Sequence, residues 1–186
     1  MEKKFPYITG HQKRVAQLAC DIAKEIDLPE KQIDRLRTSS ILHDIGMIYM
    51  PTEILTKPAT LTEIERLMIK VHPQVGYEIL KGIEFPWPVA EIVLQHHERL
   101  DGSGYPKGLS GWDILLPARI LAVADVVAAM TSHRPYRPGL GIEMALEELT
   151  KNQGILYDER IAAACIKLFT LRGFTFEVFP GLEWVR

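Results

Sequence analysis

Histidine and aspartate residues recur along this chain in a pattern that suits metal binding. Five of the six histidines fall in segments whose apolar residues have helical spacing, and one is followed directly by an aspartate. The residues concerned are His11, His43, Asp44, His72, His96, His97 and Asp125. Imidazole and carboxylate ligands with no cysteine thiolate nearby suit first-row ions such as iron, manganese, cobalt or zinc. The pattern therefore predicts a metal centre.

Asp44 is the natural bridge between two ions, since a carboxylate offers one oxygen to each. We expect one ion to be completed by His11, His43 and Asp125, and the other by His72, His96 and His97. Two ions about 3.5–4 Å apart are a common device for in-line phosphoryl transfer, because they make a hydroxide near neutral pH and neutralise phosphate charge. This arrangement predicts hydrolysis of a phosphoester.

Each ligand also has a simpler interpretation when it is taken alone. His72 fits an ordinary histidine whose hydrogen bonds are satisfied, and Asp125 fits an acid paired with Arg119 or capping a helix. His96 and His97 could face different neighbours, because adjacent helical residues point about 100° apart. The joint pattern of seven residues favours the metal centre over these alternatives.

Length and composition limit the class of protein. A chain of 186 residues with 47% hydrophobic content fits one domain with a substantial core. A net charge of −2 gives no general field for long nucleic acid or an anionic membrane. The most apolar stretch, 114–130, contains Arg119 and Asp125, so we expect no membrane insertion and a cytoplasmic location. Cys20 and Cys165 each lie in an apolar helical pattern, which indicates reduced, buried thiols.

The first half of the chain predicts three helices. One opens at His11, a second covers residues 30–43 and is ended by Gly46, and prolines 51 and 58 bracket a loop. Residues 60–63 resemble a capping box at the start of a helix that carries Leu67, Met68, Val71 and Ile79. His72 lies within that helix, and Pro73 bends it.

The second half predicts helices around an irregular loop. Residues 89–100 deliver His96 and His97 near their C-terminal end, and the loop 101–111 follows. Residues 114–131 form a central apolar helix, and 142–151 and 159–169 are further helices. No stretch has the alternation of a strand. Phe174, Phe176, Phe179 and Trp184 form an aromatic tail that either closes the core or contacts a partner.

The order of these motifs resembles the HD-GYP subgroup of the HD-domain phosphohydrolases, over about residues 6–170. The resemblance rests on residues 6–15, His43-Asp44-Ile45-Gly46, residues 54–58, His72-Pro73, the stretch from His96 to Pro106, Ala124-Asp125 and residues 134–137. It implies an all-α fold, an HD-domain helical bundle with an HD-GYP-type substrate loop. We expect that domain to cover residues 1–173, with the tail at 174–186.

The resemblance also implies a function, hydrolysis of cyclic di-GMP to pGpG or on to GMP, in bacterial second-messenger signalling. It carries over the same seven metal ligands, with Asp44 and His43 as catalytic residues. The substrate-binding residues that it implies are Gly104, Tyr105, Pro106, Arg134 and Arg137. The cofactor is a pair of divalent ions, iron or manganese, with zinc, nickel or cobalt as alternatives.

Three positions depart from the family pattern. Met47 stands where the family usually has a lysine against a substrate phosphate, and a thioether offers neither a charge nor a donor. Tyr7 replaces a glutamate of three-metal members, which favours two ions, and Ala128 replaces a common acidic residue. These changes keep open an alternative, a degenerate module that binds metal and a nucleotide or protein partner with little or no hydrolysis. A phosphohydrolase for another nucleotide is less favoured, because the Gly104-Tyr105-Pro106 loop is intact.

Partners follow from the same resemblance. Homologues of this type commonly sit behind sensor or receiver domains, so we expect fused or associated domains of that kind, or a homodimer. The chain begins only ten residues before its first predicted ligand, His11. It is therefore either a stand-alone domain or a fragment of a longer regulator.

Overall fold

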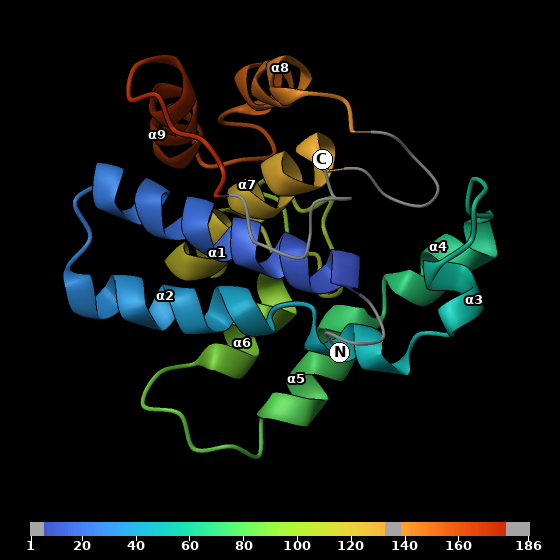
Figure 1. The fold of residues 1–186 in the computed structure, drawn as a ribbon. Helices are drawn as coiled ribbons and strands as arrows, with labels where there is room; N and C mark the ends of the chain where they lie inside the picture. Colours follow the sequence, from blue (N-terminus) through green and yellow to red (C-terminus); the bar gives the residue numbers. More distant parts are fainter. Residues whose placement is uncertain (1–5, 133–138, 178–186) are drawn as a thin grey trace.

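The chain folds into helices joined by short loops (Figure 1). The computed structural model describes residues 6–132 and 139–177. Its elements are α1 (Pro6–Glu25), α2 (Glu30–Leu42), η1 (Ile45–Tyr49), α3 (Thr52–Leu55), α4 (Glu63–Ile69), α5 (His72–Leu80), α6 (Val89–Gln95), η2 (Gly111–Asp113), α7 (Leu116–Thr131), α8 (Ile142–Asn152) and α9 (Glu159–Thr170). Within the described ranges no strand is formed, and Gln153 and Tyr157 make one isolated bridge. The all-α fold class is confirmed.

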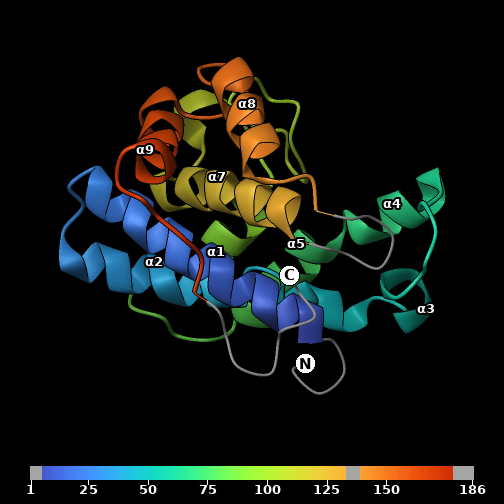
Figure 2. The same ribbon diagram turned by 45° about the horizontal axis from the view of Figure 1, so that its top comes forward.

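Helix α7 is the centre of the molecule, as its apolar sequence predicted. Nine of its sixteen residues are buried, so it is covered on most sides rather than along one stripe. Figures 1 and 2 show α1 and α2 on one side of it and α8 and α9 on the other. Alanines such as Ala118 and Ala124 have no exposed surface and let neighbouring backbones approach closely.

Helices α1 and α2 form an antiparallel pair. The turn between them places Asp27 at φ 60° and lets Leu28 N–H donate to Ala23 O at 2.9 Å. The predicted start of the first helix was wrong, because α1 begins at Pro6 and His11 lies more than one turn inside it. Proline is favoured in a first helical turn, where its missing N–H costs nothing. The side chain of His11 therefore projects from a continuous helix.

The single helix predicted around His72 is two helices. Helix α4 ends at Ile69, and α5 begins at His72 with Pro73 in its first turn, where proline is tolerated, so Pro73 does not bend a longer helix. The predicted capping box is displaced by two residues: Thr62 N–H donates to Glu65 Oε2 at 2.7 Å, and Glu65 N–H donates to Thr62 Oγ1 at 3.3 Å. The break between α4 and α5 therefore places His72 at the start of a helix.

Helices α3 and α4 project from one side of the bundle in both ribbon views (Figures 1 and 2). Helix α3 lies inside the segment between the two prolines that was predicted to be a loop. No residue of α4 is buried, and the predicted apolar positions Leu67 and Val71 are 57% and 47% exposed. The apolar pattern of this segment therefore does not mark core.

Gly46 was predicted to end the second helix, and this is wrong. Helix α2 ends at Leu42, and Gly46 lies within η1, buried against α5. A Cβ atom on Gly46 would lie 2.8 Å from Gly76 N and closer still to His72 O. Only glycine lets these two backbones approach this closely.

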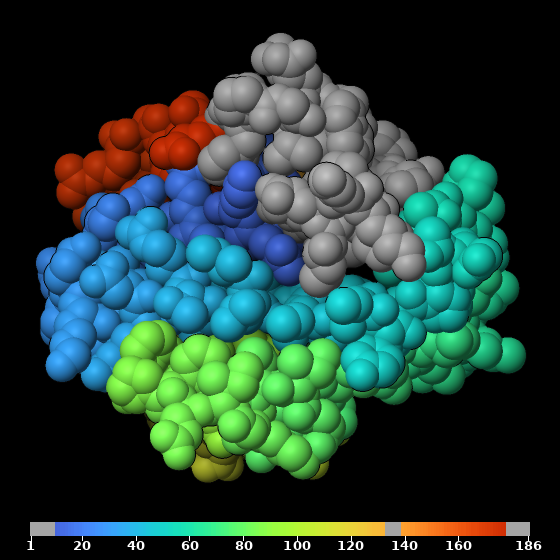
Figure 3. Space-filling view, turned by 60° about the horizontal axis from the view of Figure 1, so that its bottom comes forward, coloured from blue at the N-terminus to red at the C-terminus, as the bar shows by residue number. Residues whose placement is uncertain are grey.

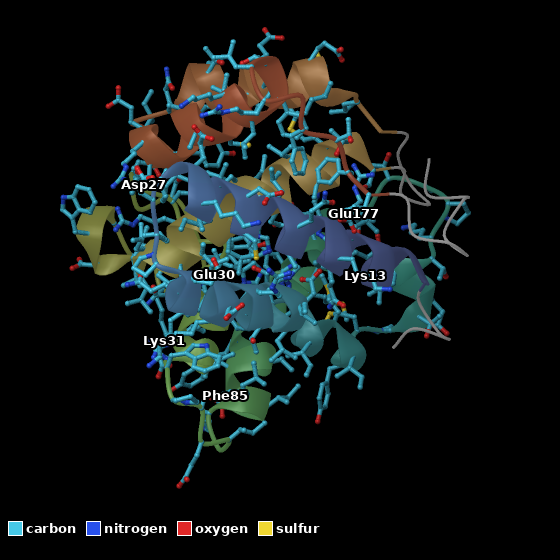
Figure 4. All side chains as sticks on the ribbon, turned by 60° about the vertical axis from the view of Figure 1, so that its left-hand side comes forward. Lys13, Asp27, Glu30, Lys31, Phe85 and Glu177 are labelled. Atoms are coloured by element: carbon cyan, nitrogen blue, oxygen red, sulfur yellow. The ribbon has the colours of Figure 1, made fainter. Side chains whose placement is uncertain are left out.

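Helices α6, α8 and α9 match their predicted positions closely, although α6 stops at Gln95 rather than near residue 100. In the space-filling view of Figure 3, α2 and the segment of α5 and α6 form adjoining bands of the surface. Arg35 of α2 lies over the ring of Trp87 at 5.6 Å, just before α6 begins. Figure 4 shows Phe85 in the same loop, at the end of the molecule away from α8 and α9.

The chain after α9 returns to α1. The side chain of Gln17 donates to Thr175 O at 3.1 Å and accepts from Glu177 N–H at 3.0 Å, and Figure 4 shows Glu177 beside α1. Phe174 and Phe176 pack on Phe169 at ring distances of 4.9 and 5.9 Å. These two phenylalanines close the core, as one of the two interpretations of the tail predicted.

The remaining predictions about the chain have different outcomes. Phe179 and Trp184 lie outside the described residues, and the boundary between a domain at 1–173 and a tail at 174–186 stays a prediction. Cys20 and Cys165 are buried free thiols, as predicted, and burial raises the pKa of Cys165 to about 12. Over the described ranges no helix has the length and apolar character to cross a membrane.

The close approach at Gly46 can be tested by adding one methyl group. Gly46→Ala would overpack two backbones, so we expect it to lower the free energy of unfolding by about 1–3 kcal/mol, measured by urea titration. Gly82→Ala is the matched control, because nothing lies within 4 Å of a Cβ atom there. Equal stability of the two variants would contradict the packing role of Gly46.

Candidate metal centre

The seven predicted ligands come together at one place in the fold. They arrive from α1, from the end of α2, from the start of α5, from the end of α6 and from the middle of α7. His11, His43, Asp44, His72, His96 and Asp125 are buried, and His97 is nearly so. Three sets among them have ligand atoms within 4.8 Å of one another, namely His72, His96 and His97; His11, His43 and Asp125; and His43, Asp44 and His96.

Three of the imidazoles are fixed by the same hydrogen bond. The Nδ1–H groups of His43, His72 and His96 donate to the backbone carbonyl three residues earlier, at 2.7, 2.8 and 2.6 Å. Each carbonyl belongs to the last turn of a helix, where backbone oxygens lack helical partners. A ring that carries its proton on Nδ1 keeps Nε2 available as a ligand.

Asp44 lies between the two predicted sets of ligands. Its Oδ1 is 3.2 Å from His72 Nε2, and its Oδ2 is 3.4 Å from His43 Nε2. His72 Nε2 is in turn 3.2 Å from His96 Nε2. One carboxylate therefore faces one histidine of each set, which is the placement expected of a bridging ligand.

Asp125 also faces histidines with both oxygens. Its Oδ1 is 2.8 Å from His11 Nε2, and its Oδ2 is 3.9 Å from His97 Nδ1. The alternative pairing with Arg119 is wrong, because Arg119 Nη1 lies 2.6 Å from Asp158 Oδ2. The acid in the apolar helix α7 therefore serves the histidine cluster.

His96 and His97 do not diverge, although adjacent helical side chains would. Helix α6 ends at Gln95, so neither histidine has to follow helical geometry. Their ring centroids are 4.1 Å apart, and those of His72 and His97 are 5.0 Å apart. Both imidazoles therefore face the same cluster.

Burial and the two carboxylates set the protonation of the site. Burial lowers the pKa of His43, but the charges of Asp44 and Asp125 outweigh it and raise that pKa to about 9. Burial, together with the neighbouring His43 and His72, lowers the pKa of His96 to about 3. Burial raises the pKa of Asp44, but the neighbouring His43 and His72 outweigh it, and the net pKa lies well below its usual value.

The donor set fits divalent metal ions. The buried Nε2 atom of His43 has no hydrogen-bond partner among the described residues, although it points at two carboxylates. Neutral imidazoles and carboxylates, without thiolates, are the ligands of first-row divalent ions. A cation would satisfy this nitrogen and both acids at once.

The predicted substrate loop folds back on the histidine pair. Tyr105 N–H donates to His97 O at 3.2 Å, and the Tyr105 ring stacks on His97 with centroids 4.7 Å apart. A Cβ atom on Gly104 would lie 2.5 Å from Arg99 N, so glycine is required for this approach. The loop thus brings an aromatic ring onto a predicted ligand.

Glu98 holds this loop, a role that was not predicted from the sequence. It is only 2% exposed, and its carboxylate accepts from Lys107 N–H at 2.7 Å and from Leu109 N–H at 3.0 Å. Its position directly after two histidines at a buried helix end was the available signal. An acid there needs a local partner, and in this case backbone N–H groups supply it.

A cavity of about 130 Å³ opens on the cluster. It is lined by His11, Asp44, Met47, Ile69, His72, His97, Tyr105 and Asp125. Met47 therefore lies beside the predicted ligands, as its place in the sequence indicated. Ala128 is fully buried in the core, and Arg134 and Arg137 lie outside the described residues.

Comparison with known proteins agrees with the fold and the motifs. The family model described as "HD domain" matches residues 1–161. A cyclic di-GMP phosphodiesterase response regulator, RpfG of Xanthomonas campestris, is 42% identical over 157 residues, which cover 83% of this chain and 42% of the relative. A cyclic di-GMP phosphodiesterase of Thermotoga maritima is 41% identical over 160 residues, covering 85% and 44%.

Other relatives and solved structures extend this result. The 3'3'-cGAMP-specific phosphodiesterase 1 of Vibrio cholerae is 41% identical over 76% of this chain and 33% of its own. The HDG"Y"P protein Bd1817 of Bdellovibrio bacteriovorus has the same fold, with a TM-score of 0.73 at 21% identity over 87% of this chain and 52% of that chain. This chain spans less than half the length of the curated relatives it matches.

The protonation of His43 predicts that metal binding releases protons. A ligand imidazole must lose the proton that Asp44 and Asp125 hold on His43 below a pKa of about 9. We expect the apparent affinity for Mn²⁺ to rise about tenfold per pH unit per released proton between roughly pH 7 and 9. Calorimetry in two buffers of different ionisation enthalpy counts the protons, and an affinity independent of pH would contradict this assignment.

The role of Glu98 predicts a change in loop dynamics. Glu98→Ala removes the acceptor of two backbone hydrogen bonds, so we expect amide exchange at Lys107 and Leu109 to accelerate about tenfold or more. Asp101→Asn is the control, since Asp101 is exposed and bonds only locally, to Ser103. Unchanged protection at Lys107 and Leu109 would remove Glu98 from this role.

Proposed function

This chain belongs to the HD domain family. We propose that it belongs to the HD-GYP subgroup and is a metal-dependent phosphodiesterase that hydrolyses cyclic di-GMP to pGpG. One observation carries the proposal: seven imidazole and carboxylate side chains meet beside a cavity whose wall includes Tyr105. The names of relatives such as the Thermotoga maritima enzyme support cyclic di-GMP as substrate.

The proposed cofactor is a pair of divalent ions. His11, His43 and Asp125 would hold one, His72, His96 and His97 would hold the other, and Asp44 would bridge them. When bound, such ions neutralise phosphate charge and make a water molecule a stronger nucleophile near neutral pH. Iron or manganese is proposed, with zinc, nickel or cobalt as alternatives, because all of them accept this donor set.

The protein side chains orient the reacting groups. Asp44 is ionised at neutral pH, because nearby histidines hold its pKa well below the usual value. Its carboxylate can accept a hydrogen bond from the attacking water, and His43 beside it would serve the catalytic centre as a ligand whose ring proton stays on Nδ1. The Nδ1 bonds of His43, His72 and His96 keep these rings from rotating during the reaction.

The loop residues are proposed to bind the substrate. Tyr105 presents a ring at the cavity wall, and Gly104 and Pro106 shape the turn that carries it. Arg134 and Arg137 are proposed phosphate ligands on the strength of the family resemblance. A cytoplasmic location and fused or associated sensor or receiver domains are part of the same proposal, as is a homodimer.

The alternative of a degenerate binding module rests on Met47. Its thioether lines the cavity where a cation would meet a phosphate, so turnover could be weak. The comparisons give this alternative no support, because the relatives named above are called phosphodiesterases. Ala128 gives the binding-module alternative little support, because that residue is part of the hydrophobic core.

Product analysis tests the proposal directly. We expect the manganese- or iron-loaded chain to convert cyclic di-GMP to pGpG, and Asp44→Asn to reduce turnover at least about a hundredfold. Met47→Lys should raise kcat/KM about tenfold or more, since a charged hydrogen bond is worth ~1.5–3 kcal/mol. Linear product from Met47→Lys alone would instead favour the binding module, and an inability to bind metal would contradict the assignment of the histidines.

A further inference from the structure

The cavity beside the histidine cluster carries little positive charge of its own. Its described lining residues are histidines, two aspartates, Met47, Ile69 and Tyr105, with no lysine or arginine among them. A cyclic dinucleotide has two phosphate groups, and a pair of ions acts on the one that is cleaved. Besides Arg134 and Arg137, which lie outside the described residues, a cation at the cavity mouth would help to hold the substrate.

Lys70 is placed at that mouth. It is the C-cap of α4, directly after Ile69, which lines the cavity and whose carbonyl accepts from His72 Nδ1. The Lys70 amine lies over the Tyr105 ring, 5.1 Å from its centroid. The turn that positions His72 therefore also fixes Lys70 next to the wall of the cavity.

Several other lysines are engaged by acids. Lys57 pairs with Glu65 at 2.7 Å, Lys24 pairs with Asp21 at 2.9 Å, and Lys81 pairs with Glu78. In contrast, the described residues place no carboxylate within ion-pair distance of Lys70. An ammonium group on an aromatic face keeps its three donors for an anion.

We propose that Lys70 binds a substrate phosphate at the mouth of the cavity, with the Tyr105 ring as the surface on which its amine rests. This inference rests on the proposed function and deepens it, since it names the residue that supplies the charge absent at Met47. Lys70 is a substrate-binding residue in this scheme and has no contact with the metal ligands' donor atoms. It acts on binding rather than on the chemical step.

The test distinguishes the effect of the Lys70 charge on substrate binding from a structural effect of the substitution. Lys70→Gln should raise KM for cyclic di-GMP about tenfold or more, with kcat and metal content close to those of the parent, whereas Lys70→Arg should stay within about threefold. The matched control is Lys81→Gln, because Lys81 is also a helix C-cap, with its amine 5.9 Å from the centroid of Tyr77. The KM of the parent should rise with ionic strength more steeply than that of Lys70→Gln.

Several results would overturn the role of Lys70. They are an unchanged KM in Lys70→Gln, an equal rise in the Lys81→Gln control, or loss of bound metal in Lys70→Gln. Failure of the proposed function is a separate result, visible as absence of product from the parent. In that case the role of Lys70 is tested by calorimetric binding of cyclic di-GMP to the manganese-loaded chain. Lys70→Gln should weaken this binding about tenfold, and equal affinity of the parent and the variant would reject the proposal.

Discussion

The hydrogen bond from an imidazole Nδ1–H to the carbonyl three residues earlier is the interaction on which the centre depends. It occurs at His43, His72 and His96, and in each case it satisfies a carbonyl at the end of a helix. The same bond sets the tautomer and turns Nε2 inward. Helix termination and ligand orientation are therefore one event, and the places where α2, α4 and α6 stop determine where the cluster lies.

Burying these groups has a large desolvation cost, which only their mutual arrangement offsets. Asp44 faces two histidines and Asp125 faces three, and His43, whose pKa the two acids raise to about 9, supplies a counter-charge to both. A buried charge that lost its partners would be costly, so the acids and imidazoles have to arrive together. This requirement explains why the very apolar helix α7 carries Asp125 at its centre, and why Gly46 must let η1 approach α5 so closely.

The sequence was sufficient for the chemistry of the cluster and for most of the helices. The clustering of the seven predicted ligands, the central helix α7 and the two C-terminal helices all follow from residue type and helical spacing. The break before His72 did not follow, because apolar spacing runs through it and only Pro73 in a first turn marks the start. The packing role of Gly46 and the role of Glu98 did not follow either, because both act through contacts with backbone that is distant in sequence.

Substrate choice and metal binding are carried by different parts of the structure. The ligands are fixed by helix ends, and the same cluster would serve any phosphodiester. The groups that a particular nucleotide would meet are Met47, Ile69 and Tyr105, which come from η1, from the end of α4 and from the loop held by Glu98. Helix α4 has no buried residue, so its substitutions are little constrained by packing. On the proposed function, selectivity among cyclic dinucleotides can therefore change at α4 and the Tyr105 loop while the buried centre stays the same.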